Sequence, residues 1–283
     1  MNMQQYLALA LQLSIALTVL GLGLTATWQD ATYLLRRPAL LLRAVLSMSV
    51  VMPLGVLMIG KLFSFPTEVG LALVALAISP VPPILYKRQL GGGGRREYVV
   101  GLLVAMGLLS IVLVPVSVEI LNQVFSTSVL VSPGVVARIM VTSVLAPLAF
   151  GLLIRQWFPV AEKSAAHIIA LAGLLLVVGA GMLLWGLWPV TRGLLGNGVA
   201  LMLAVIALMG LLIGHLLGGP AAGDRTTLAM ATAARHPAVA FTIASAAGAS
   251  QQSALAAILL YVVIAALISI PYQKWRARLA PAP

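Results

Sequence analysis

Apolar runs of about 20 residues, the length that a helix needs to cross about 30 Å of hydrocarbon, recur from one end of this chain to the other. The runs are too long and too evenly apolar for the alternating strands of an outer-membrane barrel. Hydrophobic residues make up 61% of the sequence and charged residues 8%, which leaves too little polar surface for a water-soluble domain. Lipid offers no partner to an unpaired backbone amide, so the sequence predicts an all-α integral membrane protein.

The spacing of the apolar runs predicts about nine transmembrane helices in a single domain over residues 1–283, because no connection is long enough to fold separately. The predicted helices span residues 4–26, 38–60, 66–86, 97–122, 134–155, 164–187, 194–217, 226–247 and 253–273. The chain contains no cysteine, which excludes disulfides and thiolate metal sites.

The basic residues indicate how the chain is oriented. The net charge is +11, and nearly all the lysines and arginines fall on alternate connections between the predicted helices. Under the positive-inside rule, this asymmetry predicts an outside amino terminus and a cytoplasmic carboxyl terminus. We expect a multi-pass protein of a bacterial inner membrane, and nucleic acid is not an expected partner.

Two predicted helices contain interruptions. The segment ISPVPPILYKR (residues 78–88) carries Pro80, Pro82 and Pro83, and the segment ATAARHPAVAF (residues 231–241) carries Pro237. Prolines at such depth break or kink a helix. The two segments lie five helices apart and so cross the membrane in opposite directions, which predicts inverted repeats over residues 4–122 and 164–273, linked by the helix at 134–155. Interrupted helices in matching positions of two halves indicate the binding site of a secondary transporter.

Two stretches resemble a known family. LGLGLTATWQDATYLLRRPALLLRAVLSMSVVMPLG (residues 20–55) and LALVALAISPVPP (residues 71–83) are similar to the bile acid:sodium symporter family, part of a superfamily that also includes arsenite exporters. The resemblance implies a core domain with two crossing discontinuous helices, a flatter panel domain, and a carrier of organic anions. It also implies the nine-helix form of the family, without the extra first helix of ten-helix members.

The chain departs from the family where sodium is bound. The resemblance implies a Glu, a Gln and an Asn at the second interruption, and this chain has Ala231, Arg235 and His236 there. Sodium binding needs several oxygen ligands, preferably with a carboxylate. Sodium is therefore a disfavoured co-substrate, and no other cofactor or metal is expected.

Arg235 lies ten residues after Arg225, or about 15 Å along a helix, which puts it near the middle of the bilayer. A cation there costs at least about 2.5–3.5 kcal/mol and usually marks function. We expect its guanidinium to replace the sodium charge where the interrupted helices cross, with an anionic substrate as its partner. The alternative is structural: Arg235 would donate hydrogen bonds to carbonyl groups freed at the SPVPP interruption.

The predicted substrate-binding residues come from both interruptions, and two basic residues follow the first as a cytoplasmic path. His236, next to an arginine, is expected to be neutral and hydrogen-bonded or capping, not a proton carrier. The binding residues are Arg235, His236, Pro237, Thr232, Ser79, Pro80, Pro82, Pro83 and Tyr86, and the path residues are Lys87 and Arg88.

The sequence therefore predicts a secondary active or facilitative transporter that moves a small organic anion by alternating access, without sodium. Enzymatic activity is not expected, because the chain lacks the motifs of intramembrane metalloproteases, aspartyl proteases and prenyl transferases. Two alternatives stay open. One is a sodium-dependent symporter with displaced ion sites, and the other is a non-transporting sensor or a channel on the same fold.

Overall fold

The computed structural model describes residues 3–63, 66–83, 86–125, 129–195 and 198–279, apart from the side chains of residues 3–8, 86 and 87. Within these ranges the chain forms helices and turns and no strand. Six helical stretches there are long and apolar enough to cross a membrane. They are Pro38–Leu62, Arg96–Phe125, Pro133–Trp157, Pro159–Gly186, Val199–Leu217 and Gln251–Leu279. The prediction of an all-α, multi-pass membrane protein is confirmed.

Two of the six stretches change their helical form midway. The first consists of α3 (Pro38–Val45), the π-helical η1 (Leu46–Val51) and α4 (Met52–Leu62). The third consists of α8 (Pro133–Met140), the π-helical η3 (Val141–Leu145) and α9 (Ala146–Trp157). The others are α7 (Arg96–Phe125), α10 (Ala165–Gly186) after the 3-10 turn η4 (Pro159–Ser164), α12 (Val199–Leu217) and α15 (Gln251–Leu279).

The three remaining predicted helices are α1 (Met3–Thr25) and two interrupted segments. One interrupted segment consists of α5 (Thr67–Ile78) and α6 (Tyr86–Gly91), and the other of α13 (Ala222–Ala233) and α14 (Pro237–Ala246). The predicted starts at 194 and 226 are wrong. Residues 194–195 end a separate helix, α11 (Trp188–Leu195), and α13 begins at Ala222. The sequence also did not predict the one-turn α2 (Trp28–Ala31).

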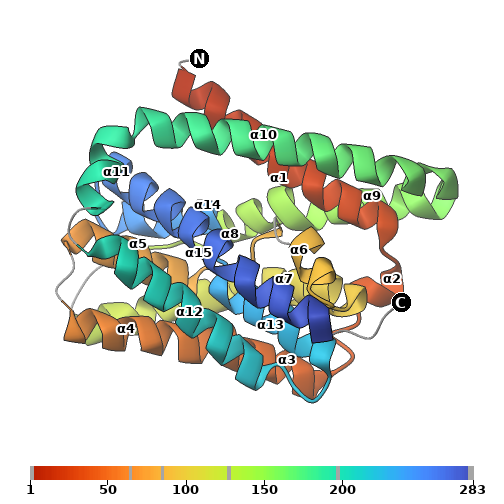
Figure 1. The fold of residues 1–283 in the computed structure, drawn as a ribbon, viewed down its shortest axis with the longest axis horizontal. Helices are drawn as coiled ribbons and strands as arrows, with labels where there is room; N and C mark the ends of the chain where they lie inside the picture. Colours follow the sequence, from red (N-terminus) through yellow and green to blue (C-terminus); the bar gives the residue numbers. More distant parts are fainter. Residues whose placement is uncertain (1–2, 64–65, 84–85, 126–128, 196–197, 280–283) are drawn as a thin grey trace.

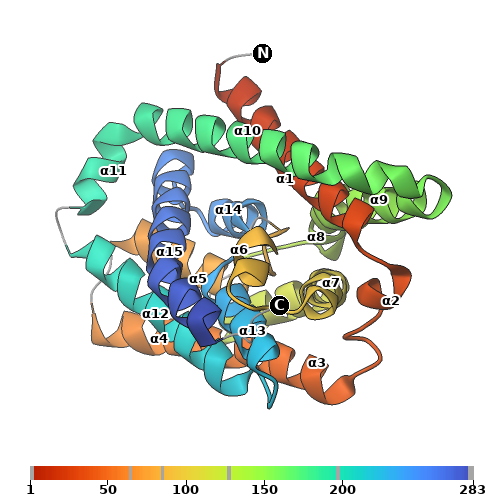
Figure 2. The same ribbon diagram turned by 45° about the vertical axis from the view of Figure 1, so that its right-hand side comes forward.

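The helices form two groups. The helix α1 packs against both α9 and α10 along one side of the molecule, where Figures 1 and 2 show α1 and α10 above the rest. The second group is built around α12, α13 and α15, with α5 and α14 packed against each other and against α15. Both interrupted segments therefore belong to this second group.

Proline explains the two π-helical segments. Pro53 and Pro147 lie just after η1 and η3, at the second position of α4 and α9. A proline inside a helix donates no N–H, and its ring clashes with the carbonyl group four residues earlier. Widening of the preceding turn to an i→i+5 pattern relieves this clash, and such π turns are often found at functional sites.

Small residues hold α13 tightly on α12. A Cβ atom added to Gly210 would lie 2.7 Å from the Cα of Ala233, and one added to Gly214 would lie 2.5 Å from the Cα of Ala229. These glycines and alanines recur every four residues, as in other closely packed membrane helices. This close packing fixes the position of α13, the half-helix that leads to the second interruption.

Basic side chains gather at one end of the molecule. Arg96 and Arg155 each donate to the carbonyl oxygen of Thr25 at 2.7 Å, at the end of α1. The guanidinium of Arg276, near the end of α15, donates to the carbonyl oxygen of Ala222 at 2.9 Å. For Arg96 and Arg155 the acceptor lies at the carboxyl terminus of α1, an end that favours cations. The connections predicted to be cytoplasmic thus meet at the same end.

Candidate functional site

The two interruptions contact each other in the middle of the second helix group. The backbone N–H of His236 donates to the carbonyl oxygen of Pro80 at 2.9 Å. Ser79, Ala234 and His236 all have extended backbones, and Pro237 takes the first position of α14. Proline suits this position because its φ is fixed near the helical value and its missing N–H is not needed there. We call this contact region the crossover.

Arg235 lies at the crossover and is only 2% exposed. Its Nη1 donates to the carbonyl oxygen of Ser79 and its Nη2 to that of Met48, both at 3.1 Å. Nε has no partner among the described residues. These residues include all six acids of the chain, and none of their carboxylates forms an ion pair with Arg235.

The carbonyl group of Ser79 needs an outside donor because proline follows it. In a continuing α-helix it would accept from residue 83, and in a 3-10 turn from residue 82. Both residues are prolines and have no N–H. Arg235 supplies the missing donor, which is the structural role considered above for this side chain.

The carbonyl group of Met48 lacks a donor within its own helix for the same reason. In η1 the N–H of Met52 donates to Ser47 instead of Met48, which is the π pattern of five residues. In this pattern the partner of Met48 would be residue 53, which is also a proline. One guanidinium therefore replaces two donors that prolines in two different helices cannot provide.

Backbone dipoles balance the charge of Arg235. The helices α5 and α13 both end at the crossover, and a helix carboxyl terminus carries about half a negative charge. At the end of α13, the carbonyl group of Ala233 would pair with residue 237, again a proline. The Tyr261 hydroxyl, from α15, donates to this carbonyl at 2.6 Å instead. Arg235 therefore has compensation without a carboxylate.

His236 is completely buried and contacts η3. Its Nε2 lies 3.4 Å from the Ser143 hydroxyl, which itself donates to the carbonyl oxygen of Ile139 at 2.5 Å. Since the Ser143 hydrogen is used, Nε2 carries the hydrogen and donates to Ser143. His236 occupies the N-cap position of α14 without a side-chain capping bond, and its Nδ1 has no partner among the described residues. The role of this side chain stays a prediction.

Other predicted residues contribute less directly. Thr232 is paired with the Ser47 hydroxyl at 2.7 Å, and the Ser79 hydroxyl donates within its own helix to Leu76. Pro82 and Pro83 are buried. Arg88, of the predicted cytoplasmic path, donates to the carbonyl oxygen of Ala266 in α15 at 2.9 Å. The side chains of Tyr86 and Lys87 lie outside the part of the chain that the structure describes.

Sequence reasoning missed four residues that complete the crossover. They are Ser47, Met48, Ser143 and Tyr261, from η1, η3 and α15. Pro53 and Pro147 were the available signals for the first three, because each interrupts an otherwise continuous apolar helix. No pattern in the sequence pointed to Tyr261.

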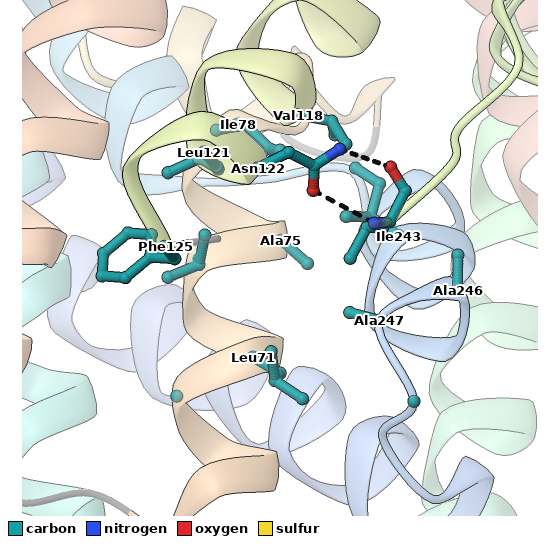
Figure 3. A pocket seen from close by; sticks show the side chains of 14 residues that line it. Leu71, Ala75, Ile78, Val118, Leu121, Asn122, Phe125, Ile243, Ala246 and Ala247 are labelled. Atoms are coloured by element: carbon teal, nitrogen blue, oxygen red, sulfur yellow. Dashed lines mark hydrogen bonds between the residues drawn. The ribbon is translucent and has the colours of Figure 1, made fainter. Parts of the chain in front are cut away.

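A cavity of about 590 Å³ lies between α5, α7 and α14, at the end opposite the basic one. Figure 3 shows Leu71, Ala75, Ile243 and Ala246 around it, with Asn122 as the polar side chain in its wall. The Asn122 amide is bonded to the backbone of Val129: Nδ2 donates to the carbonyl oxygen at 2.7 Å, and Oδ1 accepts from the N–H at 3.1 Å. The lining suits an apolar group.

The described residues contain no group of three or more histidines, aspartates or glutamates placed to hold a metal ion. Interrupted membrane helices that meet at a buried charge are typical of membrane transporters.

The chain belongs to the Sodium Bile acid symporter family, whose sequence profile matches residues 12–187. It is accordingly a transporter of the bile acid or organic anion type. None of the curated proteins compared with the chain matches it significantly. The matched region includes the first interruption and ends before the second, so Arg235 lies outside it.

Proposed function

We propose that the chain carries a small organic anion by alternating access and does not require sodium. The observation that carries this proposal is the pairing of Arg235 with two main-chain carbonyl oxygens at the crossover. In transporters with interrupted helices, carbonyl groups of this kind coordinate the coupling cation. Here the guanidinium takes up these oxygens, and the residues at the second interruption supply no carboxylate.

We also propose that the chain crosses the membrane nine times. Six of these crossings would be the long helices. The other three would be α1 and the two interrupted segments, each counted as one crossing. Residues 4–122 and 164–273 would be inverted repeats, linked by the helix at 134–155. The clustering of basic side chains at one end supports a cytoplasmic carboxyl terminus, an outside amino terminus and insertion into a bacterial inner membrane.

The substrate would meet two kinds of surface. The fixed charge of Arg235 and the amino terminus of α14 favour an anionic group at the crossover, near His236, Pro237 and Ser79. The cavity between α5, α7 and α14 favours an apolar body for the same molecule. Arg235 donates two hydrogen bonds to the backbone in this conformation, and its Nε has no partner among the described residues. Its charge would act on the substrate across the crossover before any direct contact forms.

Uptake into proteoliposomes tests the proposal. A panel of radiolabelled carboxylates and sulfonates would be offered with sodium chloride or with choline chloride at equal ionic strength. We expect at least one anion to enter at equal rates in both salts, and Arg235→Gln to abolish its uptake. Strict dependence on sodium would support displaced ion sites and contradict the proposal. Binding without flux, or ion conductance, would support the sensor or the channel.

A further inference from the structure

Two arginines from distant parts of the chain meet at the turn between α12 and α13. The side chain of Arg43, in α3, packs on Gly219 of this turn, since a Cβ atom built on Gly219 would lie 4.0 Å from the Arg43 Cδ. Arg225, in the first turn of α13, donates from Nε to the Gly219 carbonyl oxygen at 2.7 Å. Figures 1 and 2 show this turn beside α3, at the basic end of the molecule. The fold thus brings two cationic side chains to one place.

Glycine makes this approach possible. Gly219 has a φ of +91°, a conformation that other residues rarely adopt. A Cβ atom on Gly218 would overlap the Cα of Arg225. The turn therefore needs glycine at both positions to hold the start of α13 against the end of α12, with Arg225 beside it.

No carboxylate neutralises this pair within the described part of the chain. That part includes all six acids, and their ion pairs involve only Arg95 and Arg155. Asp224, next to Arg225 in sequence, is buried and directed at Arg95. Two like charges that reach the same turn repel each other, and an anion bound between them would relieve this repulsion.

The pair lies at the edge of the lipid-facing surface. Leu46, one turn after Arg43 in the first long stretch, and Leu216, three residues before Gly219 in α12, are exposed apolar side chains. Both helical stretches are mostly exposed along their apolar spans, so their outer faces contact acyl chains. Basic residues at the end of such helices lie at the level of the lipid headgroups.

We propose that Arg43 and Arg225 bind the phosphate of one anionic phospholipid, in the leaflet at the basic end of the molecule. The planar guanidinium matches the geometry of phosphate oxygens, and basic pockets between membrane helices bind lipid headgroups. The acyl chains of this lipid lie along α3 and α12, past Leu46 and Leu216. Both parts of the ligand therefore have a matching surface.

The bound phosphate joins the same two segments that Arg235 joins deeper in the membrane. Met48 lies five residues after Arg43, and Arg235 lies ten residues after Arg225. The Arg235 guanidinium donates to the Met48 carbonyl oxygen at 3.1 Å. A shared counterion at the basic end replaces repulsion between these segments with attraction, so the lipid stabilises the contact between α3 and α13.

Thermal unfolding in mixed micelles tests this site without any assumption about transport. Phosphatidylglycerol, added to the protein in a neutral detergent, should raise the Tm of the wild type by about 4 °C relative to the same mole fraction of phosphatidylcholine. Arg43→Gln/Arg225→Gln should lose this gain. Arg43→Gln alone, which breaks no hydrogen bond among the described residues, should lose about half of it. Lys163→Gln/Arg278→Gln removes the same charge from exposed positions elsewhere and should keep the full gain.

Three results would overturn the proposal. A full gain in Arg43→Gln/Arg225→Gln would place the lipid elsewhere, and an equal loss in both double variants would reduce the effect to general attraction between charges. Inorganic phosphate at the same phosphate concentration should leave the Tm unchanged, and a gain as large as that from phosphatidylglycerol would assign the site to a soluble anion.

Native mass spectrometry of the same mixtures counts the bound lipid directly. The wild type should retain one molecule of phosphatidylglycerol that Arg43→Gln/Arg225→Gln does not retain, whereas Lys163→Gln/Arg278→Gln should follow the wild type. Equal retention of phosphatidylglycerol and phosphatidylcholine by the wild type would contradict recognition of an anionic headgroup.

Discussion

Arg235 replaces two backbone donors that prolines cannot provide, and a double-mutant cycle can measure this directly. The variant Arg235→Met removes the charge but keeps an apolar side chain of similar length. It would leave the carbonyl groups of Ser79 and Met48 without donors, because Pro82, Pro83 and Pro53 cannot serve them. Adding Pro53→Ala restores one backbone donor, whether η1 keeps its π pattern or becomes an α-helix.

The expected magnitudes follow from the hydrogen bonds. Two bonds from a charged donor contribute about 1.5–3 kcal/mol each to the free energy of unfolding. Removal of a buried cation also removes its unfavourable free energy in the membrane, about 2.5–3.5 kcal/mol, and this offsets part of the loss. The net destabilisation by Arg235→Met should therefore be about 1–2 kcal/mol, and Pro53→Ala should reduce it by about 1 kcal/mol because Met48 has regained a partner.

Equilibrium unfolding in mixed micelles, monitored by tryptophan fluorescence, provides the four free energies of the cycle. Pro147→Ala is the matched control, since it removes the corresponding proline after η3, where no contact with Arg235 is seen among the described residues. It should show no coupling to Arg235→Met. If Arg235→Met lowers the free energy of unfolding by the same amount in the wild-type and Pro53→Ala backgrounds, the compensation argument is refuted.

Three further variants test other parts of the structure. Gly214→Val should prevent α12 and α13 from approaching and lower the yield of folded protein in size-exclusion chromatography, whereas Gly173→Ala, with open space around its Cα, should not. Tyr261→Phe leaves the Ala233 carbonyl group unpaired and should lower the free energy of unfolding by about 1–2 kcal/mol, whereas Tyr98→Phe, which removes a buried hydroxyl without a partner among the described residues, should not lower it. Ala246→Trp should fill the cavity beside α14 and block anion uptake at unchanged Tm, and uptake equal to that of the lipid-facing control Leu174→Trp would exclude this cavity from the path.

The sequence predicted the membrane class, the long helices and both interruptions because these depend on local composition. Apolar length sets the crossings, and Pro80, Pro82, Pro83 and Pro237 break the helices wherever those helices pack. Counting four residues back from Pro83 and Pro237 would also have named Ser79 and Ala233 as carbonyl groups in need of donors. The sequence thus contained more of the crossover than the apolar pattern alone revealed.

The remaining features depend on contacts between distant segments. Met48 lies five residues before Pro53, so its unpaired carbonyl group follows only once η1 is known to be π-helical. Tyr261 reaches Ala233 from another helix, and no local pattern encodes that approach. The binding roles of Arg235, His236 and the neighbouring residues stay predictions, because a side chain held by the backbone at rest can still act on a passing anion through its charge.

The covalent attachment of Arg235 limits the energetics of the proposed carrier. A dissolved ion is released on the far side in each turnover and thereby delivers the work stored in its gradient, whereas a side chain returns with the protein. The charge of Arg235 would favour movement of the anion through the crossover. It would not add to the concentration gradient of the anion that the carrier can build. Uphill movement of the anion would then have to draw on another solute that crosses the bilayer in the same cycle.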